Sequence, residues 1–187
     1  MTDSRSALSK LRIAGWAIVG LLLLLPVAAM RLQVDGVDWG TEDFIVAFVL
    51  LVGSGLLIEG LVRVSHNPAY RLGAALAVLT TLFMIWSNLA VGIVGSENDP
   101  FNSFYFLLLP LIALGALIVR LRARGMAAVM ALAAIFPVGM AIAALALRKH
   151  LQPMGSVTEI VGVNSLFVLL YGLSALLFWK TARRPVP

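Results

Sequence analysis

The sequence alternates long apolar runs with short polar connections, and this pattern predicts an all-α membrane protein. Each run has about the 17–25 residues that a helix needs to cross roughly 30 Å of hydrocarbon. Runs such as LLLLLPVAAM (21–30) lack the alternation of barrel strands, and helices satisfy their own backbone hydrogen bonds in lipid. The six predicted spans are residues 13–30, 44–62, 72–94, 103–119, 126–147 and 158–179.

The connections between these spans are short, so consecutive helices are expected to be antiparallel neighbours in a compact bundle. We therefore predict a single transmembrane domain over residues 1–187. The first span has a second interpretation as a signal peptide, because Val27, Ala28 and Ala29 fit a small-residue cleavage site. Our preferred interpretation is a retained first helix that contains Pro26.

Composition agrees with a membrane protein and excludes several kinds of chemistry. The chain is 61% hydrophobic and 12% charged, whereas about a quarter of a soluble domain is charged. Cysteine is absent, which excludes disulfides, thiol catalysis and thiolate metal sites. His66 and His150 lie in predicted loops, so axial histidines for a haem within the bundle are not predicted. We expect no cofactor, and lipid as the main contact.

The basic residues predict the orientation of the chain in the membrane. Cytoplasmic loops carry an excess of Lys and Arg. With a cytoplasmic N-terminus, eleven of the 14 basic residues fall on the cytoplasmic side: Arg5, Lys10, Arg12, Arg63, Arg71, Arg120, Arg122, Arg124, Lys180, Arg183 and Arg184. We therefore predict that both termini are cytoplasmic. Because orientation accounts for the positive charge, we expect no nucleic-acid partner.

Asn88 is an unexpected amide in the third span. Thr81 and Asn88 share a narrow stripe at 100° per residue, with Ser87 beside it, and such a face turns toward other helices. Asn88 lies six residues before the predicted end of its span, and Asn164 lies six residues after the start of the last span. Both are then about 9 Å deep. We predict that the two amides hydrogen-bond, directly or through water, and that the deeper Tyr171 extends the set.

This polar set has two interpretations. Amides between membrane helices commonly serve as interhelical contacts worth about 0.6 kcal/mol each. They also line the solute sites of transporters, where the same atoms must stay available to the solute. We favour interhelical contacts and keep a solute site as the alternative.

Glu59 is one of two acidic residues within the predicted spans, and the other, Glu159, is the second residue of the last span. Glu59 lies four residues before Arg63, which is the favourable order for an ion pair on a helix. We predict this pair at the cytoplasmic interface. The alternative is a proton or cation relay, because an acid inside a membrane is often functional.

Acidic residues gather in two predicted outer loops, DGVDWGTED and GSENDPFN. Oxygen ligands of this kind bind Ca²⁺ or Mg²⁺, although the spacing does not match an EF-hand. The candidate ligands are Asp35, Asp38, Glu97 and Asp99. Helix starts offer a simpler explanation for part of the pattern. Asp99-Pro100 resembles an N-cap followed by proline, and Thr41 is a candidate cap of the second helix with Glu42 and Asp43 at its positive dipole end. Asn67-Pro68 has the same cap pattern at the start of the third helix.

The stretch NLAVGIVGSENDPFN, residues 88–102, resembles a run found in a family of small uncharacterised polytopic inner-membrane proteins of Gram-negative bacteria. The resemblance covers the predicted outer end of the third span and the loop that follows. That family has no assigned activity. The resemblance therefore implies a bacterial inner membrane and no particular reaction.

Three hypotheses of function follow, in order of preference. The first is a structural or accessory protein, as a homo-oligomer or part of a larger membrane complex. The second is a small-solute or ion transporter that uses Asn88, Asn164 and Tyr171, with Glu59 as the coupling acid. The third is a membrane enzyme with its site at the outer acidic loops.

Overall fold

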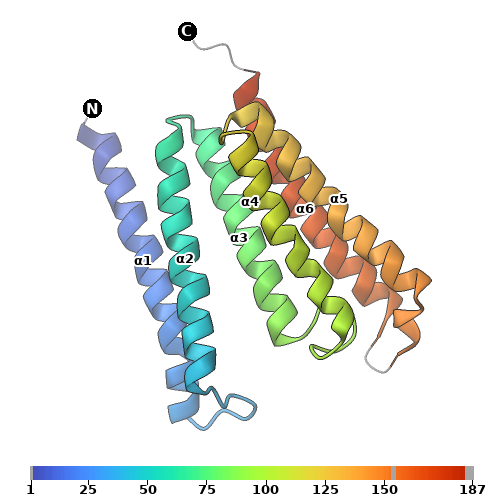
Figure 1. Ribbon diagram of the computed structural model, residues 1–187. Helices are drawn as coiled ribbons and strands as arrows, with labels where there is room; N and C mark the ends of the chain where they lie inside the picture. The colour runs from blue at the N-terminus through green and yellow to red at the C-terminus, as the bar shows by residue number, and fades with distance from the viewer. Residues whose placement is uncertain (1, 153–154, 184–187) are drawn as a thin grey trace. The chain divides into compact units, whose positions relative to one another are not determined.

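The computed structural model describes residues 2–152 and 155–183, without the side chains of residues 2–9 and 11. Over that range the chain is all-helical, and six helices are long and apolar enough to cross a membrane. The elements are α1 (Thr2–Arg31), α2 (Thr41–Val64), α3 (Pro68–Ala90), the 3₁₀ helix η1 (Pro100–Leu107), α4 (Leu108–Ile118), α5 (Ala123–Ala146), the 3₁₀ helix η2 (Lys149–Leu151) and α6 (Val157–Ala182) (Figure 1).

The predicted all-α fold class with six helices long and apolar enough to cross a membrane is confirmed. The orientation of the termini stays a prediction. Of the basic residues on which it rests, Arg184 and the side chain of Arg5 lie outside the described residues.

The chain divides into two compact units, residues 1–59 and 60–187. A single transmembrane domain stays a prediction. The first unit pairs α1 with most of α2 (Figure 1). Trp16 packs on Gly55 so closely that a Cβ there would lie 3.2 Å from the ring. The Arg12 guanidinium and the Trp16 indole both bond the Glu59 carboxylate, so one polar contact and one close approach hold the two helices together.

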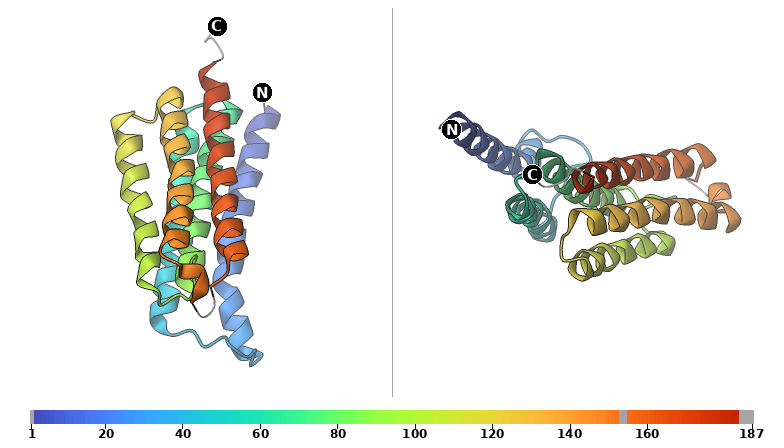
Figure 2. Two further views of the ribbon diagram at one scale, coloured as in Figure 1. Left: turned by 90° about the vertical axis from the view of Figure 1, so that its right-hand side faces the viewer. Right: turned by 90° about the horizontal axis from the view of Figure 1, so that it is seen from above.

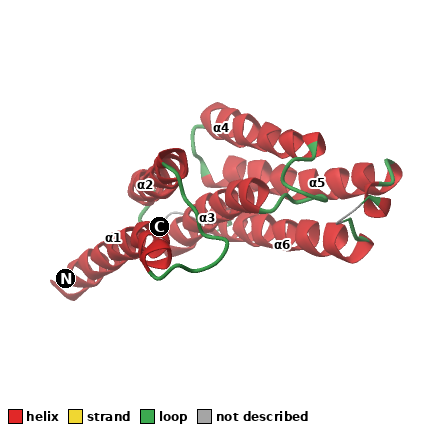
Figure 3. Cartoon of the chain, turned by 90° about the horizontal axis from the view of Figure 1, so that it is seen from below, coloured by secondary structure: helices red, strands yellow, loops and turns green. Residues whose placement is uncertain are grey.

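The second unit is built around α5 and α6, which pack along most of their length. α3 packs on α6 and α4 packs on α5, and the views along the helices show α5 between α4 and α6 (Figures 2 and 3). The small side chains of Ala133 and Ala144 are buried and permit this close packing. The sequence of α5 is rich in alanine, and small side chains suit its place between two helices.

The third span ends earlier than predicted. We expected helix to Val94, but α3 ends at Ala90. Gly92 and Gly95 adopt φ of +76° and +67°, which right-handed helix excludes and glycine tolerates. The chain therefore turns back on itself and buries Ile93 and Val94.

Local capping signals are confirmed where the chain re-enters a helix. The Asn67 side chain accepts a hydrogen bond from the Ala69 amide, and Asp99 accepts one from the Phe101 amide. Each side chain satisfies an amide that has no partner in the first helical turn. At the start of α2, Asp43 accepts a bond from the Gly40 amide.

Candidate functional site

The 3₁₀ helix η1 positions the buried polar residues at one end of the second unit. A 3₁₀ helix has three residues per turn, so side chains three apart lie on the same face. Asn102, Tyr105 and Leu108 follow this spacing and are all buried, at 3%, 0% and 1% exposure. Phe104 and Leu107, on a neighbouring face, are each 54% exposed. The tighter helix therefore presents an amide and a phenol, stacked in depth, to α3 and α6.

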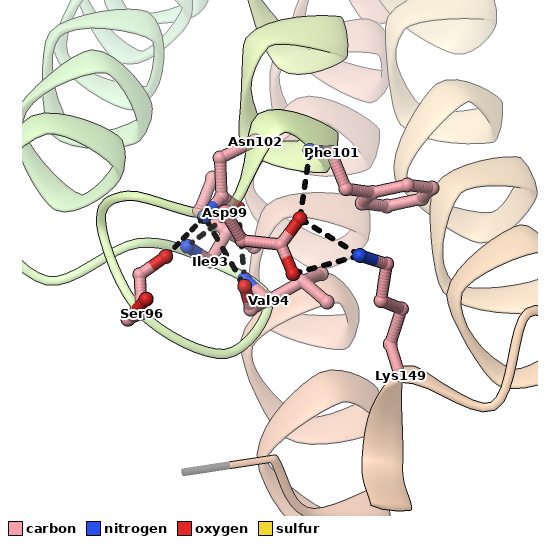
Figure 4. Close-up of polar contacts among 7 residues, drawn as sticks. All are labelled: Ile93, Val94, Ser96, Asp99, Phe101, Asn102 and Lys149. Atoms are coloured by element: carbon pink, nitrogen blue, oxygen red, sulfur yellow. Dashed lines mark hydrogen bonds and ion pairs between the residues drawn. The ribbon is translucent and has the colours of Figure 1, made fainter. Parts of the chain in front are cut away.

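Asn102 organises the segment that joins α3 to η1 (Figure 4). We call residues 91–102 the cap, and they comprise the loop 91–99 and the first three residues of η1. The Asn102 side-chain oxygen accepts hydrogen bonds from the amides of Ile93 and Val94, at 3.1 and 3.0 Å. Its side-chain nitrogen donates to the carbonyls of Val94 and Ser96, at 3.1 and 2.8 Å. One side chain thus satisfies four backbone groups where the cap leaves regular helix, as a buried irregular backbone requires.

An ion pair joins the cap to the connection between α5 and α6. The Lys149 ammonium lies 2.8 Å from each Asp99 carboxylate oxygen and 5.9 Å from the centre of the Phe101 ring (Figure 4). The side chains are only 17% and 10% exposed. The hydrogen bond from Lys149 lowers the pKa of the Asp99 carboxyl, the Phe101 amide lowers it further, and burial opposes both.

Below the cap, polar side chains meet in pairs along the interface of α6 with α3 and η1. The Tyr105 hydroxyl donates to the Asn164 side-chain oxygen at 2.9 Å, and the Asn164 side-chain nitrogen donates to the Ile160 carbonyl. The hydroxyls of Thr81 and Tyr171 lie 3.0 Å apart. We call this set of buried and half-buried polar residues the seam, and it consists of Asn88, Thr81, Tyr105, Asn164, Tyr171 and Ser174.

The seam residue farthest from the cap, Ser174, connects α6 directly to the backbone of α3. The Ser174 hydroxyl donates to the Gly73 carbonyl at 2.8 Å. A Cβ on Gly73 would lie 3.2 Å from the Leu177 Cβ, so the helices approach closely at this level. A small residue on one helix and a hydroxyl on the other is a common contact between membrane helices.

The predicted direct bond between Asn88 and Asn164 is wrong. Asn88 is buried, at 4% exposure, and turns away from lipid as expected, but its side-chain nitrogen donates to the Asn102 carbonyl at 2.9 Å. Asn164 bonds Tyr105 instead. The depth estimate failed because α3 stops at Ala90, which places Asn88 in its last turn. The Asn88 side-chain oxygen is buried with no protein partner, and the water-mediated alternative stays a prediction.

The other members of the predicted polar set have different environments. Thr81 and Tyr171 do meet, as the shared set implied. Ser87 is half-buried, and its carbonyl accepts a hydrogen bond from the Val91 amide at the end of α3.

Glu59 makes contacts that the sequence analysis missed. Its two carboxylate oxygens accept from the Arg12 guanidinium at 3.0 and 3.1 Å, and one of them also accepts from the Trp16 indole at 2.8 Å. The partners come from a helix more than 40 residues earlier in the chain, so no local pattern indicated them. The pair with Arg63 stays a prediction.

The candidate outer cation site does not assemble in the described part of the chain, where no three potential metal ligands come together. Asp99 is occupied by Lys149, and Glu97 accepts a hydrogen bond from the adjacent Asn98 amide. Asp35 and Asp38 are not drawn into any such group. Helix capping and ion pairing account for the contacts of the Asp99 carboxylate.

The sequence analysis did not predict the structural roles of Asn102, Tyr105 and Lys149. Asn102 lies in the outer stretch GSENDPFN but was not among the candidate ligands. The spacing of three between Asn102 and Tyr105 was the available signal, but it indicates a shared face only once a 3₁₀ helix is known. Lys149 was counted as an exception to the positive-inside pattern, and its partner Asp99 is 50 residues away in sequence.

Comparison of the chain with protein-family models, curated proteins and solved structures finds no match. The family resemblance of residues 88–102 therefore stays a prediction. In the structure, four residues of that stretch shape the cap through a hydrogen bond or a turn: Asn88, Gly92, Asp99 and Asn102.

Proposed function

We propose that this protein is a structural or accessory component of the bacterial inner membrane, with both termini cytoplasmic. The observation that carries the proposal is the closure of the seam, whose side chains are engaged by one another or by backbone. Tyr105 with Asn164, Thr81 with Tyr171, and Ser174 with the Gly73 carbonyl are all bonded within the protein.

A seam whose polar side chains already bond one another or the backbone favours a structural role over transport of a solute. A solute site needs polar atoms that exchange a protein or water partner for the solute at low cost. A buried polar group that loses its partner costs about 1–3 kcal/mol. A solute that entered the seam would have to break several such bonds at once. The candidate coupling acid is also engaged, because Glu59 bonds Arg12 and Trp16.

The distribution of charge supports the proposed location and orientation. Eleven of the 14 basic residues lie on one side in the six-span arrangement, as is typical of the cytoplasmic side. The resemblance of residues 88–102 supports the bacterial inner membrane.

A small-solute or ion transporter is the second candidate, and one observation favours it. The Asn88 side-chain oxygen is buried without a protein partner, so it can accept a bond from water or a solute. A membrane enzyme at the outer acidic loops has no comparable support, because the described acids there do not converge.

Cysteine labelling separates the two candidates, and the absence of native cysteine makes it clean. We expect Ser174→Cys and Asn164→Cys to resist a membrane-impermeant thiol reagent in proteoliposomes. The exposed Asn98→Cys is the matched control and should react fully. Reaction of both buried positions at the control rate would overturn the closed-seam argument and favour the transporter.

The structural role itself is tested by gentle purification with chemical crosslinking. We expect the protein to crosslink to itself or to another membrane protein at a constant ratio that survives dilution. Proteoliposomes of the pure protein should show no solute or proton flux that Glu59→Gln abolishes. A monomer with saturable, Glu59-dependent flux would contradict the proposal.

A further inference from the structure

The end of the second unit opposite the cap carries exposed cations without balancing acids. Five exposed basic side chains lie at the α4–α5 turn and at the end of α6: Arg120, Arg122, Arg124, Lys180 and Arg183. We call these five residues the basic rim. Residues 100–158 and 160–187 contain no Asp or Glu. Glu97, Asp99 and Glu159, the acids after Gly60, belong to the loops and helix starts at the cap end. The positive charge of the rim is therefore uncompensated in the described part of this unit.

Tyr70 holds the two parts of the basic rim together. Its hydroxyl donates to the Leu121 carbonyl at 2.7 Å, in the turn between α4 and α5. Its ring meets the ring of Phe178 of α6 edge-on, with centroids 5.0 Å apart. Leu121 lies between two rim arginines in sequence, and Phe178 lies two residues before Lys180. Because Tyr70 is only 2% exposed, the cations are arranged around a packed residue and are not free tails.

The basic rim lies where the apolar surface of the unit ends. Leu117 and Ile118, just before it, are 71% and 80% exposed, as lipid-facing residues are. Trp179 is 40% exposed, and the Arg183 guanidinium lies 5.0 Å from the centre of its ring. Tryptophan at the end of a membrane helix sits at headgroup level. The rim is thus placed at the depth of lipid phosphates.

We propose that the basic rim binds the phosphate headgroups of anionic phospholipids. Guanidinium groups match phosphate oxygens with paired hydrogen bonds, and four of the five rim residues are arginines. Arg71 shows the contrasting arrangement, because its guanidinium donates to the carbonyls of Val62 and Ser65 within the protein. The rim cations have no such partners in the described chain. This inference goes beyond the structural role proposed above and does not depend on the orientation of the termini.

The test compares two double variants of the full chain in nanodiscs of phosphatidylcholine with a minor fraction of phosphatidylglycerol. The first, Arg122→Gln with Arg124→Gln, removes two rim charges. The matched control, Arg31→Gln with Arg148→Asn, removes two exposed charges elsewhere, and asparagine suits the positive φ of residue 148. Lipid that remains on the protein after release is identified by mass spectrometry. Both faces of a nanodisc are accessible, so an altered orientation cannot affect the result.

We expect phosphatidylglycerol to be enriched on the unmodified chain and on the control. Each rim cation should contribute about fivefold to the enrichment, so the rim variant should lose about 25-fold. Added salt should reduce the enrichment, because exposed charges are screened. Equal enrichment on the two variants would overturn the proposal. Displacement of the lipid by inorganic phosphate, beyond that caused by sodium chloride of equal ionic strength, would overturn the assignment to a lipid headgroup.

Discussion

Asn102 is the residue on which the cap depends most, because its side chain bonds four backbone groups. Leucine has a similar volume but no polar atoms, so Asn102→Leu leaves these buried groups unpaired. We expect a loss of at least about 4 kcal/mol in the free energy of unfolding, since four buried groups lose their partner and each costs about 1–3 kcal/mol. Denaturant unfolding in detergent micelles measures it.

Asn98→Leu is the matched control in the same loop. The Asn98 amide is exposed and bonds the neighbouring Glu97 side chain, which water can replace. The free energy of unfolding of Asn98→Leu should stay within about 0.5 kcal/mol of that of the unmodified protein, as for an ordinary surface position. A similar loss in both variants would show that Asn102 does not organise the cap.

The ion pair of Asp99 with Lys149 predicts a loss of stability in acid. The folded state lowers the pKa of Asp99, chiefly through the hydrogen bond from Lys149. A lowered pKa contributes stability above the unfolded pKa of about 4, and the contribution is lost as pH falls through the folded pKa. We expect about 1 kcal/mol at neutral pH, the value typical of a partly exposed pair.

Asp99→Asn isolates this contribution, because asparagine keeps an oxygen that can accept from the Phe101 amide. The two proteins should differ in melting temperature at pH 7 and converge below pH 4. A difference that stays constant or grows in acid would contradict the assigned sign.

The sequence alone predicted the contacts that residues make with their near neighbours in sequence. Asn67 and Asp99 each cap a helix that begins with the next residue, so the whole signal lies within three positions. The partners of Asn88 and Asn164 depend on where Gly92 turns the chain and on the pitch of η1. The turn at Gly92 and the pitch of η1 cannot be predicted from hydrophobic periodicity, because that analysis takes every span to be an α-helix.

At the scale of elements, the α4–α5 hairpin depends on close approach at Gly125. A Cβ on Gly125 would lie 2.3 Å from the Val119 Cβ, a distance that side-chain rotation cannot relieve. We expect Gly125→Ala to lower the melting temperature by several degrees, consistent with a cost of about 1–3 kcal/mol for overpacking.

Gly139, on the same helix, supplies the control because a Cβ there meets nothing within 4 Å. Gly139→Ala should leave stability unchanged or raise it by up to about 1 kcal/mol, since alanine favours helix. If both substitutions had the same effect, helix propensity and not contact with Val119 would explain it.

The spans were predictable because the bilayer imposes a length and an apolar composition on every crossing element. The exception is the fourth span, where the apolar run is continuous but Pro100–Leu107 is a 3₁₀ helix. Apolar composition does not distinguish the two helix types. Asn102 and Tyr105 share a face only because this segment is a 3₁₀ helix. The sequence therefore predicted the apolar span but not the polar contacts that these two residues make.

At the scale of the whole molecule, the two ends of the second unit differ in chemistry. At one end Lys149 is neutralised by Asp99 and covers Phe101, so this cation is part of the packed cap. At the other end the basic rim is exposed and has no balancing acid in the described part of the second unit. This asymmetry is what the positive-inside rule requires if the rim is cytoplasmic, and it leads to a direct test of orientation.

Single cysteines at the two ends report the orientation in intact bacterial cells. We expect Asn98→Cys, in the cap, to react with an impermeant thiol reagent from the periplasm. Ala182→Cys, exposed at the end of α6, should react only after the inner membrane is opened. Because the chain has no native cysteine, each signal comes from one position. Labelling of Ala182→Cys in intact cells, with Asn98→Cys protected, would mean that the basic rim faces the periplasm and that positive charge does not set the orientation of this protein.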